Sequence, residues 1–363
     1  MLILHQLTAD CPILYGMLPT RYKLNRQRNQ DASQGELALL DRIRNRAGLP
    51  ATGEIRLGIG DDCALLHPKP SEELAVTTDL SIAGRHFRLD WHPPEAIGHR
   101  TLARGLSDLA AMGARPVAAF LSLGLPRELT IRRGGRPAWF DRFLDGFLGL
   151  ANACKTPLAG GDLAESPVTV ADIVLIGAVP KGRALLRSGA RPGDLVYVTG
   201  SLGGAAAALL KLGQLAAATR TKAPSISNKN KNLLAPHLHP QPRIPQGLWL
   251  QRRGLATASI DLSDGLSTDL AHLCAESGVT AEVEAAALPL HPAATLDQAL
   301  NGGEDYELLV TAPPDVKLPP RISGIAITRI GRILPARHGR SPVTLISAEG
   351  AQPLRARGWQ HFS

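Results

Sequence analysis

The chain has 363 residues, a length that predicts two domains and leaves enough sequence for a sizeable buried core. Hydrophobic residues make up 44% and charged residues 20%, which are ordinary globular values and exclude a fibre or a disordered chain. No apolar run approaches the roughly 18 residues that span a bilayer. The start of the chain lacks the basic and apolar blocks of a secretory signal. We therefore expect a cytoplasmic protein without membrane contact.

The net charge of +8 raises the question of a nucleic-acid partner. The excess of Lys and Arg lies mostly in two peripheral stretches, 220–232 and 315–363. Only Trp359 and Phe362 lie near them, so the regularly spaced aromatic residues of a single-strand binding surface are missing. We expect no nucleic-acid partner, and interpret the basic residues as a solvated face or as an attraction for an anionic substrate.

The predicted elements begin after residues 1–34, which are polar, basic and without periodicity, and which we interpret as a disordered extension outside the fold. From there on, short apolar runs alternate with helical patterns, so an α/β protein is expected. Helices are expected at 35–46, 93–112, 139–153 and 205–212, and strands at 74–78, 117–123, 168–179, 195–198, 257–261 and 306–311.

A domain boundary is predicted near 180–192, where a strand ends and a connection rich in Gly, Pro and Arg begins. This gives an N-terminal domain at 35–182 and a C-terminal α+β domain at 183–363. Within the second, residues 219–232 are rich in Ser, Asn and Lys without an apolar period, and are expected to form a surface insertion.

Acidic residues recur beside predicted strand ends and Gly turns. They are Asp61-Asp62, Thr77-Thr78-Asp79, Ser107-Asp108, Gly161-Asp162, Asp261-Leu262-Ser263-Asp264-Gly265 and Gly303-Glu304-Asp305. Turn chemistry or helix capping explains any single one. Because strand ends of α/β sheets converge on one edge, the whole set predicts a single acidic pocket.

Several carboxylates in one pocket need cations to neutralise them. Oxygen ligands from Asp, Thr and Ser, without His or Cys at metal spacing, favour Mg²⁺, which usually also binds substrate phosphates. Asp261 and Ser263 lie on the same side of an extended strand and Asp264 follows at a turn, so three oxygen ligands can face one point. Phosphoryl transfer is therefore predicted. The chain lacks a Walker loop, a complete dinucleotide-binding motif and a GxSxG elbow, which argues against those classes.

The chain resembles the thiamine-monophosphate kinase family in seven motifs that occur in the same order. They are GIGDDCALL (58–66), TTDLSIAGRHF (77–87), GLSDLAAMGARP (105–116), GGDLAES (160–166), GRALLRSGARPGD (182–194), IDLSDGLSTDL (260–270) and GGEDYELL (302–309). The resemblance spans about residues 35–363. It implies ATP-dependent phosphorylation of thiamine monophosphate to thiamine diphosphate on the two-domain fold of aminoimidazole ribonucleotide synthetase, with the N-terminal domain as the ATP- and magnesium-binding one and its sheet pairing across a homodimer.

The resemblance also implies roles for single residues. The magnesium ligands would be Asp62, Thr77, Thr78, Asp79, Asp108, Asp162, Asp261 and Asp264. ATP would be contacted by Gly161, Asp162, Arg187 and Ser263. Thiamine monophosphate would be contacted by His86, Glu304 and Trp359. The acceptor phosphate is already ionised at neutral pH, so no catalytic base is required, and Asp108 and Asp264 are expected to matter most. Glu304 would face the cationic thiazolium ring and Trp359 would stack on it. Gly105 stands where the family suggests a polar residue.

Two kinds of alternative stay open. One is another ATP-using enzyme of the same fold, such as a selenophosphate synthetase, the hydrogenase-maturation dehydratase or aminoimidazole ribonucleotide synthetase itself. The first would need a reactive Cys or selenocysteine near an N-terminus rich in Gly and Lys. The second would need a Cys at the extreme C-terminus, whereas this chain ends His361-Phe362-Ser363. The other is a non-catalytic basic binding protein, which would leave the acidic set unexplained.

Overall fold

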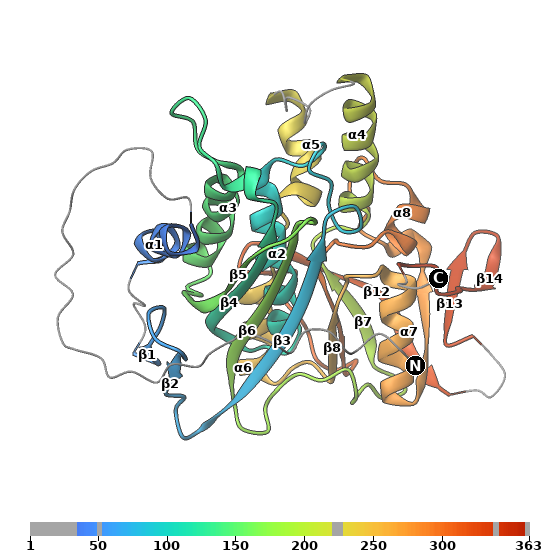
Figure 1. The fold of residues 1–363 in the computed structure, drawn as a ribbon. Helices are drawn as coiled ribbons and strands as arrows, with labels where there is room; N and C mark the ends of the chain where they lie inside the picture. Colours follow the sequence, from blue (N-terminus) through green and yellow to red (C-terminus); the bar gives the residue numbers. More distant parts are fainter. Residues whose placement is uncertain (1–34, 49–52, 220–227, 337–340, 360–363) are drawn as a thin grey trace, which may run out of the picture. The chain divides into compact units, whose positions relative to one another are not determined.

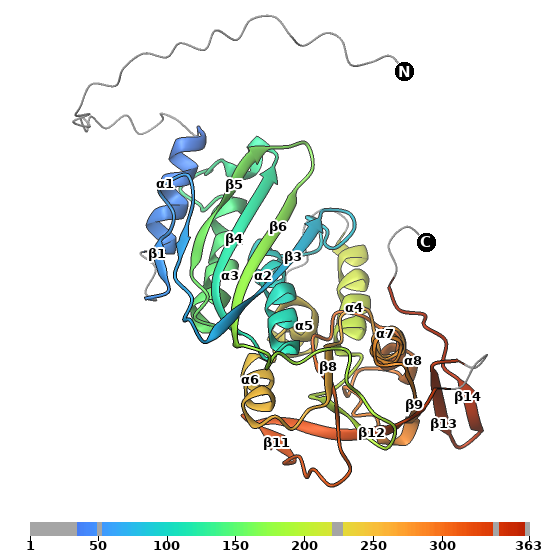
Figure 2. The same ribbon diagram turned by 90° about the horizontal axis from the view of Figure 1, so that it is seen from below.

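Two large β-sheets and the helices around them make up the part of the chain that the structure, a computed structural model, describes: residues 35–48, 53–219, 228–336 and 341–359 (Figures 1 and 2). The expected extension at 1–34 lies outside these residues. The mixed α/β class expected from the alternating patterns is confirmed.

The first sheet has four strands in the order β3-β6-β4-β5 (Figure 2). They are β3 (Glu72–Ile82), β4 (Arg115–Leu125), β5 (Leu158–Glu165) and β6 (Val170–Pro180). β6 pairs antiparallel with both of its neighbours, and β4 and β5 are parallel. A separate pair, β1 (Ile55–Leu57) and β2 (Leu65–Leu66), precedes them.

Helices α2 (Pro94–Ala111) and α3 (Trp139–Ala153) cover one face of this sheet, and α1 (Glu36–Ala47) adds to the same core. α3 presents Phe140, Phe143 and Phe147 at helical spacing, and all three side chains are fully buried. α2 comes close to β6 through Gly105, where a Cβ atom would lie 2.9 Å from the Cδ1 atoms of both Ile173 and Leu175. A larger residue at position 105 would require the tips of these two side chains to shift.

The second sheet follows the order β14-β13-β9-β12-β7-β10-β8, with β11 paired to β12. Its strands are β7 (Leu195–Thr199), β8 (Ala258–Asp261), β9 (Val279–Glu284), β10 (Leu308–Ala312), β11 (Arg321–Ile322), β12 (Ile325–Pro335), β13 (Val343–Ser347) and β14 (Gly350–Pro353). The helices in this half are α4 (Gly204–Thr219), α5 (Asn228–Leu238), α6 (Ile244–Arg253), α7 (Leu266–Ser277) and α8 (Leu296–Asn301). The β13–β9 pair is parallel and the other pairs are antiparallel.

Each helix and strand expected from the sequence is present, with ends moved by a few residues, except that α4 runs on to Thr219. Several elements were not expected, among them β5, whose run is interrupted by Gly160 and Gly161, and the amphipathic helix α7.

Residues 220–227 of the expected surface insertion at 219–232 lie outside the described residues, and its last residues form the start of helix α5 at Asn228. Lys231 and Asn232 are exposed there. Further along this helix, Leu234 and Leu238 are buried against Ala208 and Leu212 of α4.

Residues 34–363 form a single unit by their contacts, so the division at 182/183 stays a prediction. Among the described residues, none of the helices is both long and apolar enough to cross a membrane.

Candidate active site

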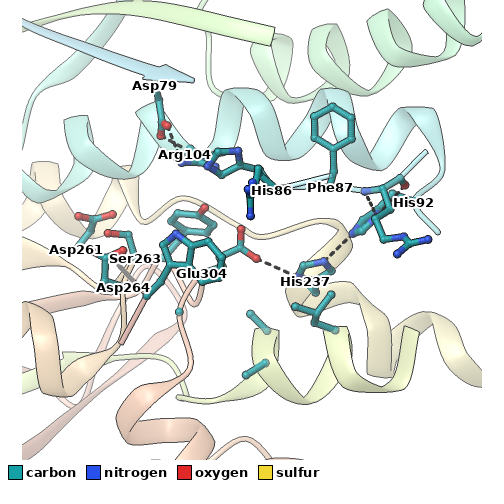
Figure 3. A pocket seen from close by; sticks show the side chains of 18 of the residues that line it. Asp79, His86, Phe87, His92, Arg104, His237, Asp261, Ser263, Asp264 and Glu304 are labelled. Atoms are coloured by element: carbon teal, nitrogen blue, oxygen red, sulfur yellow. Dashed lines mark hydrogen bonds and ion pairs between the residues drawn. The ribbon is translucent and has the colours of Figure 1, made fainter. Parts of the chain in front are cut away.

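A cavity of about 380 Å³ lies between α2 and β3 on one side and β8 with the 302–307 loop on the other (Figure 3). Many of the residues expected at the site line this cavity: Asp79, His86, Asp108, Asp261, Ser263, Asp264, Glu304 and Trp359. They come from segments as far apart in sequence as β3 and the C-terminal stretch. The structure therefore brings together four of the six acidic motifs that the sequence predicted to meet, and the motifs of Asp62 and Asp162 do not line the cavity.

Helix α2 contributes a polar stripe to an otherwise buried apolar helix. Arg100, Arg104 and Asp108 follow one another at intervals of four residues and so lie on one helix face. Ser107, on the adjoining position, is also buried. Because α2 packs between the first sheet and β8, this face points at the acids of both.

Strand β3 places alternate residues on the face that α2 covers. Thr77 Oγ1 donates a hydrogen bond to Asp108 Oδ2 at 2.5 Å. Asp79 accepts two contacts from Arg104, one from Nε at 2.9 Å and one from Nη2 at 2.7 Å. The pKa of Asp108 is raised by burial and by the charge of Asp79, although the Thr77 hydrogen bond acts in the opposite direction.

Asp261 at the end of β8 is buried beside the same group. Ser107 Oγ donates a hydrogen bond to its Oδ2 atom at 2.7 Å. Burial, together with the charge of Asp108, raises the pKa of Asp261 to about 7. The charge of Asp108 on helix α2 therefore disfavours the ionisation of Asp261 on strand β8, which is the condition that a bound cation relieves.

The loop after α8 lies directly against the loop after β8. Glu304 N donates to Ser263 O at 2.8 Å, and Tyr306 N donates to Leu262 O at 2.9 Å. A Cβ atom at Gly303 would lie 2.6 Å from Ser263 O, so a residue without a side chain is required there. These contacts continue the β8–β10 pairing and hold Ser263 and Glu304 on the same wall of the cavity.

The C-terminal stretch closes onto this wall. Trp359 N donates to Asp264 O at 3.1 Å, and Gly358 N donates to Thr268 Oγ1 at 3.0 Å. The Trp359 side chain is 51% exposed and lines the cavity. An aromatic ring is therefore available at the rim beside Asp264.

Glu304 lies between the acidic residues and a pair of histidines (Figure 3). Its Oε1 atom accepts a hydrogen bond from Arg100 Nη2 at 2.6 Å, and its Oε2 atom lies 3.3 Å from His237 Nδ1. Burial acts to raise the pKa of Glu304, but Arg100 and His237 outweigh it and hold the pKa below its ordinary value. The carboxylate at this end of the cavity is thus kept ionised.

Two of the expected ligands point to the other face of the first sheet. Thr78 alternates with Thr77 and Asp79 along β3, so its side chain is exposed on the face that the helices leave open. Asp162 is exposed on β5, with Oδ1 accepting from the Leu163 N–H at 2.9 Å. These residues share a sheet with Asp79 but do not line the cavity.

The remaining expected residues lie near the cavity or apart from it. Gly161 has a φ of +148°, and a Cβ atom there would lie 1.9 Å from Leu121 O, so only Gly fits. Asp62 is exposed in the stretch before β2. Arg187 is exposed in the connection between the sheets, yet its charge lowers the pKa of Asp261 against the larger effect of burial.

Within the part of the chain that the structure describes, no three His, Cys, Asp or Glu side chains are already arranged around a metal position. The acids are held by protein donors instead, as Asp79 is by Arg104 and Asp108 by Thr77. The donor set still fits Mg²⁺, because this ion needs only one or two carboxylates and completes its coordination with water and substrate phosphates. Asp79, Asp108, Asp261 and Asp264 would supply those carboxylates.

Comparison with known proteins matches residues 60–179 to the N-terminal domain of AIR synthase related proteins and residues 191–341 to their C-terminal domain. The thiamine-monophosphate kinase of Escherichia coli K12 is 41% identical over 345 residues, which cover 91% of this chain and 98% of that protein. The chain belongs to the thiamine-monophosphate kinase family. The family member from Haemophilus influenzae is 35% identical, covering 91% of this chain and 98% of its own.

Solved structures of the family agree with this membership. The thiamine-monophosphate kinase of Stenotrophomonas maltophilia K279a superposes with a TM-score of 0.71 at 38% identity, covering 85% of this chain and 96% of that one. AaThiL complexed with AMPPCP and TMP superposes with a TM-score of 0.68 at 30% identity, and the match covers 90% of this chain and 97% of that one. Escherichia coli HypE shares the fold alone: its TM-score is 0.66 at 18% identity, and the match covers 88% of this chain and 96% of that one.

Sequence reasoning missed the basic partners of the acids in this member of the family. Arg100 and Arg104 each hold a carboxylate from another segment, and His237 supports Glu304 from α5. The signal for the two arginines was available, because a polar stripe at four-residue spacing on an apolar helix indicates a buried polar surface. His237 gave no such signal, since nothing in its local sequence connects it with position 304.

Proposed function

We propose that this protein phosphorylates thiamine monophosphate to thiamine diphosphate, with ATP as the phosphoryl donor and direct in-line transfer between the two substrates. The observation that carries the proposal is the meeting of Asp79, Asp108, Asp261 and Asp264 in one cavity with Glu304 at its other end. Family membership supports the choice of substrates. A family structure holds AMPPCP and TMP together, and we extend those ligands to this chain.

Each wall of the cavity has a task in this reaction. We assign the magnesium-binding role to the four aspartates, with Asp62, Thr77, Thr78 and Asp162 as further ligands expected from the family motifs. Several Mg²⁺ ions would offset the repulsion between two polyanions and stabilise charge on the transferred phosphoryl group. No protein base is needed, since a phosphate oxygen is the nucleophile.

Substrate contacts divide between ATP and thiamine monophosphate. We assign the ATP contacts to Ser263, which lines the cavity, and to Gly161, Asp162 and Arg187, which lie outside its lining. Arg187 offers a bidentate guanidinium to a phosphate. The thiamine end is formed by His86, Glu304 and Trp359. The carboxylate of Glu304 attracts the positive thiazolium, and the indole of Trp359 offers a π face to it. His86 is held in place by its Nδ1 atom, which accepts the Ile82 N–H at 3.0 Å.

We also propose a homodimer formed through the open face of the first sheet. Leu74, Val76 and Leu80 of β3 are 42%, 60% and 45% exposed there, and β3 is an edge strand of its sheet. Apolar side chains along an edge strand are usually covered in the native assembly. The cytoplasmic location expected from the sequence stays a prediction.

Incubation with ATP, Mg²⁺ and thiamine monophosphate, followed by mass spectrometric identification of the product, tests the function. Thiamine diphosphate and ADP in equal amounts are expected. Selenide plus ATP, and a carbamoylated peptide plus ATP, serve as the control substrates for the two related activities of the fold. Turnover of either control substrate, without formation of thiamine diphosphate, would overturn the proposal in favour of that related activity.

A further inference from the structure

A buried polar network lies behind Glu304 that the phosphoryl transfer itself does not use. It consists of Arg100 from α2, His92 from the turn before α2 and His237 from α5, which are 4%, 2% and 1% exposed. Buried charged and polar groups are costly unless each has a partner. The members of the network therefore satisfy one another. His92, His237 and Glu304 also line the cavity, whereas Arg100 does not (Figure 3).

Both carboxylate oxygens of Glu304 contact the network. Arg100 donates from Nη2 to Oε1 at 2.6 Å and from Nη1 to the backbone oxygen of His237 at 2.5 Å. His237 Nδ1 lies 3.3 Å from Oε2. Arg100 thus ties the carboxylate and helix α5 together with one guanidinium, which fixes the orientation of the carboxylate plane.

The two histidines are linked to each other and to Arg100. Burial lowers the pKa of His92 to about 3 and also lowers that of His237, so both rings are neutral and carry one N–H. His92 Nε2 lies 2.9 Å from His237 Nε2, and His92 Nδ1 lies 3.1 Å from the backbone N and O atoms of Arg88. His237 Nδ1 lies 2.9 Å from Arg100 Nη1 as well as 3.3 Å from Glu304 Oε2, so Arg100 contacts both His237 and Glu304.

The backbone of Glu304 is held as firmly as its side chain. Its φ is +68°, in the left-handed region that residues other than Gly rarely adopt. Such a conformation persists where the surrounding structure over-determines it. The Glu304 N–H is bonded to Ser263 O at 2.8 Å, so the loop after β8 holds the backbone while Arg100 and His237 hold the carboxylate.

We propose that Arg100 and His237 are positioning residues, which hold the Glu304 carboxylate in one orientation against the cationic ring of thiamine monophosphate. The role rests on the proposed function, because it takes its purpose from the charge of that substrate. The Arg100 side chain is 5% exposed and that of Glu304 26%, so Glu304 presents an edge to the cavity while Arg100 stays behind it. Arg100 therefore acts through Glu304 and does not touch the substrate.

Steady-state kinetics of Arg100→Gln tests the role. Loss of a fixed carboxylate weakens substrate binding and transition-state binding equally, so KM for thiamine monophosphate should rise at least about tenfold, with kcat and KM for ATP within about twofold of the wild type. Arg100→Lys keeps the charge and should recover most of the change. An unchanged KM for thiamine monophosphate in Arg100→Gln would overturn the role.

The matched control is Arg243→Gln. Arg243 is a half-buried arginine in a two-point contact with a glutamate of the same segment, with Nη2 2.5 Å and Nε 2.6 Å from the oxygens of Glu307, but it does not line the cavity. It should lose thermal stability as Arg100→Gln does while its KM values stay unchanged. An equal rise of KM in both variants would show that the change in Arg100→Gln comes from a general loss of packing, which would contradict the positioning role.

Two further comparisons keep the test decisive. In a Glu304→Ala background, which removes the carboxylate, Arg100→Gln should change KM for thiamine monophosphate by less than about twofold; an additive effect would contradict action through Glu304. If Arg100→Gln folds poorly, His237→Asn, which keeps a polar atom near the Nδ1 position, should retain a lower KM for thiamine monophosphate than His237→Leu, and equal KM values in the two would contradict a role for His237. Absence of thiamine diphosphate with the wild type would overturn the proposed function and this role together, whereas an active wild type with unaffected variants overturns this role alone.

Discussion

The Ser107 hydroxyl donates a hydrogen bond to Asp261 Oδ2 at 2.7 Å, which joins helix α2 to strand β8 at the cavity. Ser107 is fully buried and Asp261 is 3% exposed. The contact brings Asp261 next to Asp108, whose charge contributes to its raised pKa. The acidic centre of the cavity is therefore formed at the junction of the two halves of the fold, and it depends on how α2 packs against β8.

Replacing single acids at this centre should stop turnover without unfolding the protein. Asp108→Asn and Asp264→Asn keep the shape of the side chain but remove a charge that Mg²⁺ needs, so kcat should fall by at least about 100-fold. Asp108→Asn should not lower the melting temperature, because the charge of Asp108 is disfavoured where it lies and its pKa is raised by burial. Asp145→Asn, an exposed acid on α3, is the control. Wild-type turnover in either active-site variant would contradict the assignment.

Trp359 should matter for thiamine monophosphate more than for ATP. Its ring lies at the cavity rim beside Asp264, so Trp359→Ala removes a stacking surface worth about 1 kcal/mol and should raise KM for thiamine monophosphate about fivefold. Trp359→Phe keeps an aromatic face and should restore most of the binding. If both KM values rise equally, Trp359 is not part of the thiamine end.

The proposed dimer can be tested by placing a charge on the open face of the first sheet. Val76→Lys should give a monomer in size-exclusion chromatography with light scattering, because a buried unpaired charge opposes association. Leu210→Lys on α4 is the matched control, since both side chains are 60% exposed in the chain described here. A monomeric wild type, or a dimeric Val76→Lys protein, would exclude this face as the interface.

Asp141 should support stability and leave catalysis untouched. Its side chain is 3% exposed, accepts from Arg132 Nε at 2.9 Å and Ala138 N at 3.0 Å, and lies 2.5 Å from Arg42 Nη2. We expect Asp141→Asn to lower the free energy of unfolding by about 2–4 kcal/mol at pH 7, with unchanged kcat below the melting temperature.

The decrease in the free energy of unfolding caused by Asp141→Asn should become smaller at low pH. Burial acts to raise the pKa of Asp141, but hydrogen bonds from Arg132 and Arg42 outweigh it and lower the pKa below its ordinary value. Its contribution is therefore fully present above the unfolded pKa of about 3.9 and is lost as the pH falls below it. Urea unfolding at pH 7 and pH 3 should show a smaller difference between wild type and Asp141→Asn at pH 3. An equal difference at both values would show that the ionised carboxylate is not the stabilising form.

Periodicity and local chemistry were enough to predict most elements around the site. The proline start of α2 and its apolar spacing predicted the helix, and the motifs around Asp79, Asp108 and Asp261 predicted an acidic pocket. The alternation of a strand also carried information that was not used: Thr77, Thr78 and Asp79 are consecutive, so they cannot all face one cavity, and Thr78 faces away.

By itself, then, the sequence determined the class of the fold, the family and most of the acids that meet. Only the tertiary structure decided which charges pair with them. The contact of Arg100 with Glu304 joins residues 204 positions apart, and Arg100 with His237 joins residues 137 apart. Such pairs depend on how α2, α5 and the 302–307 loop pack together, and packing between distant segments leaves no periodic trace along the chain.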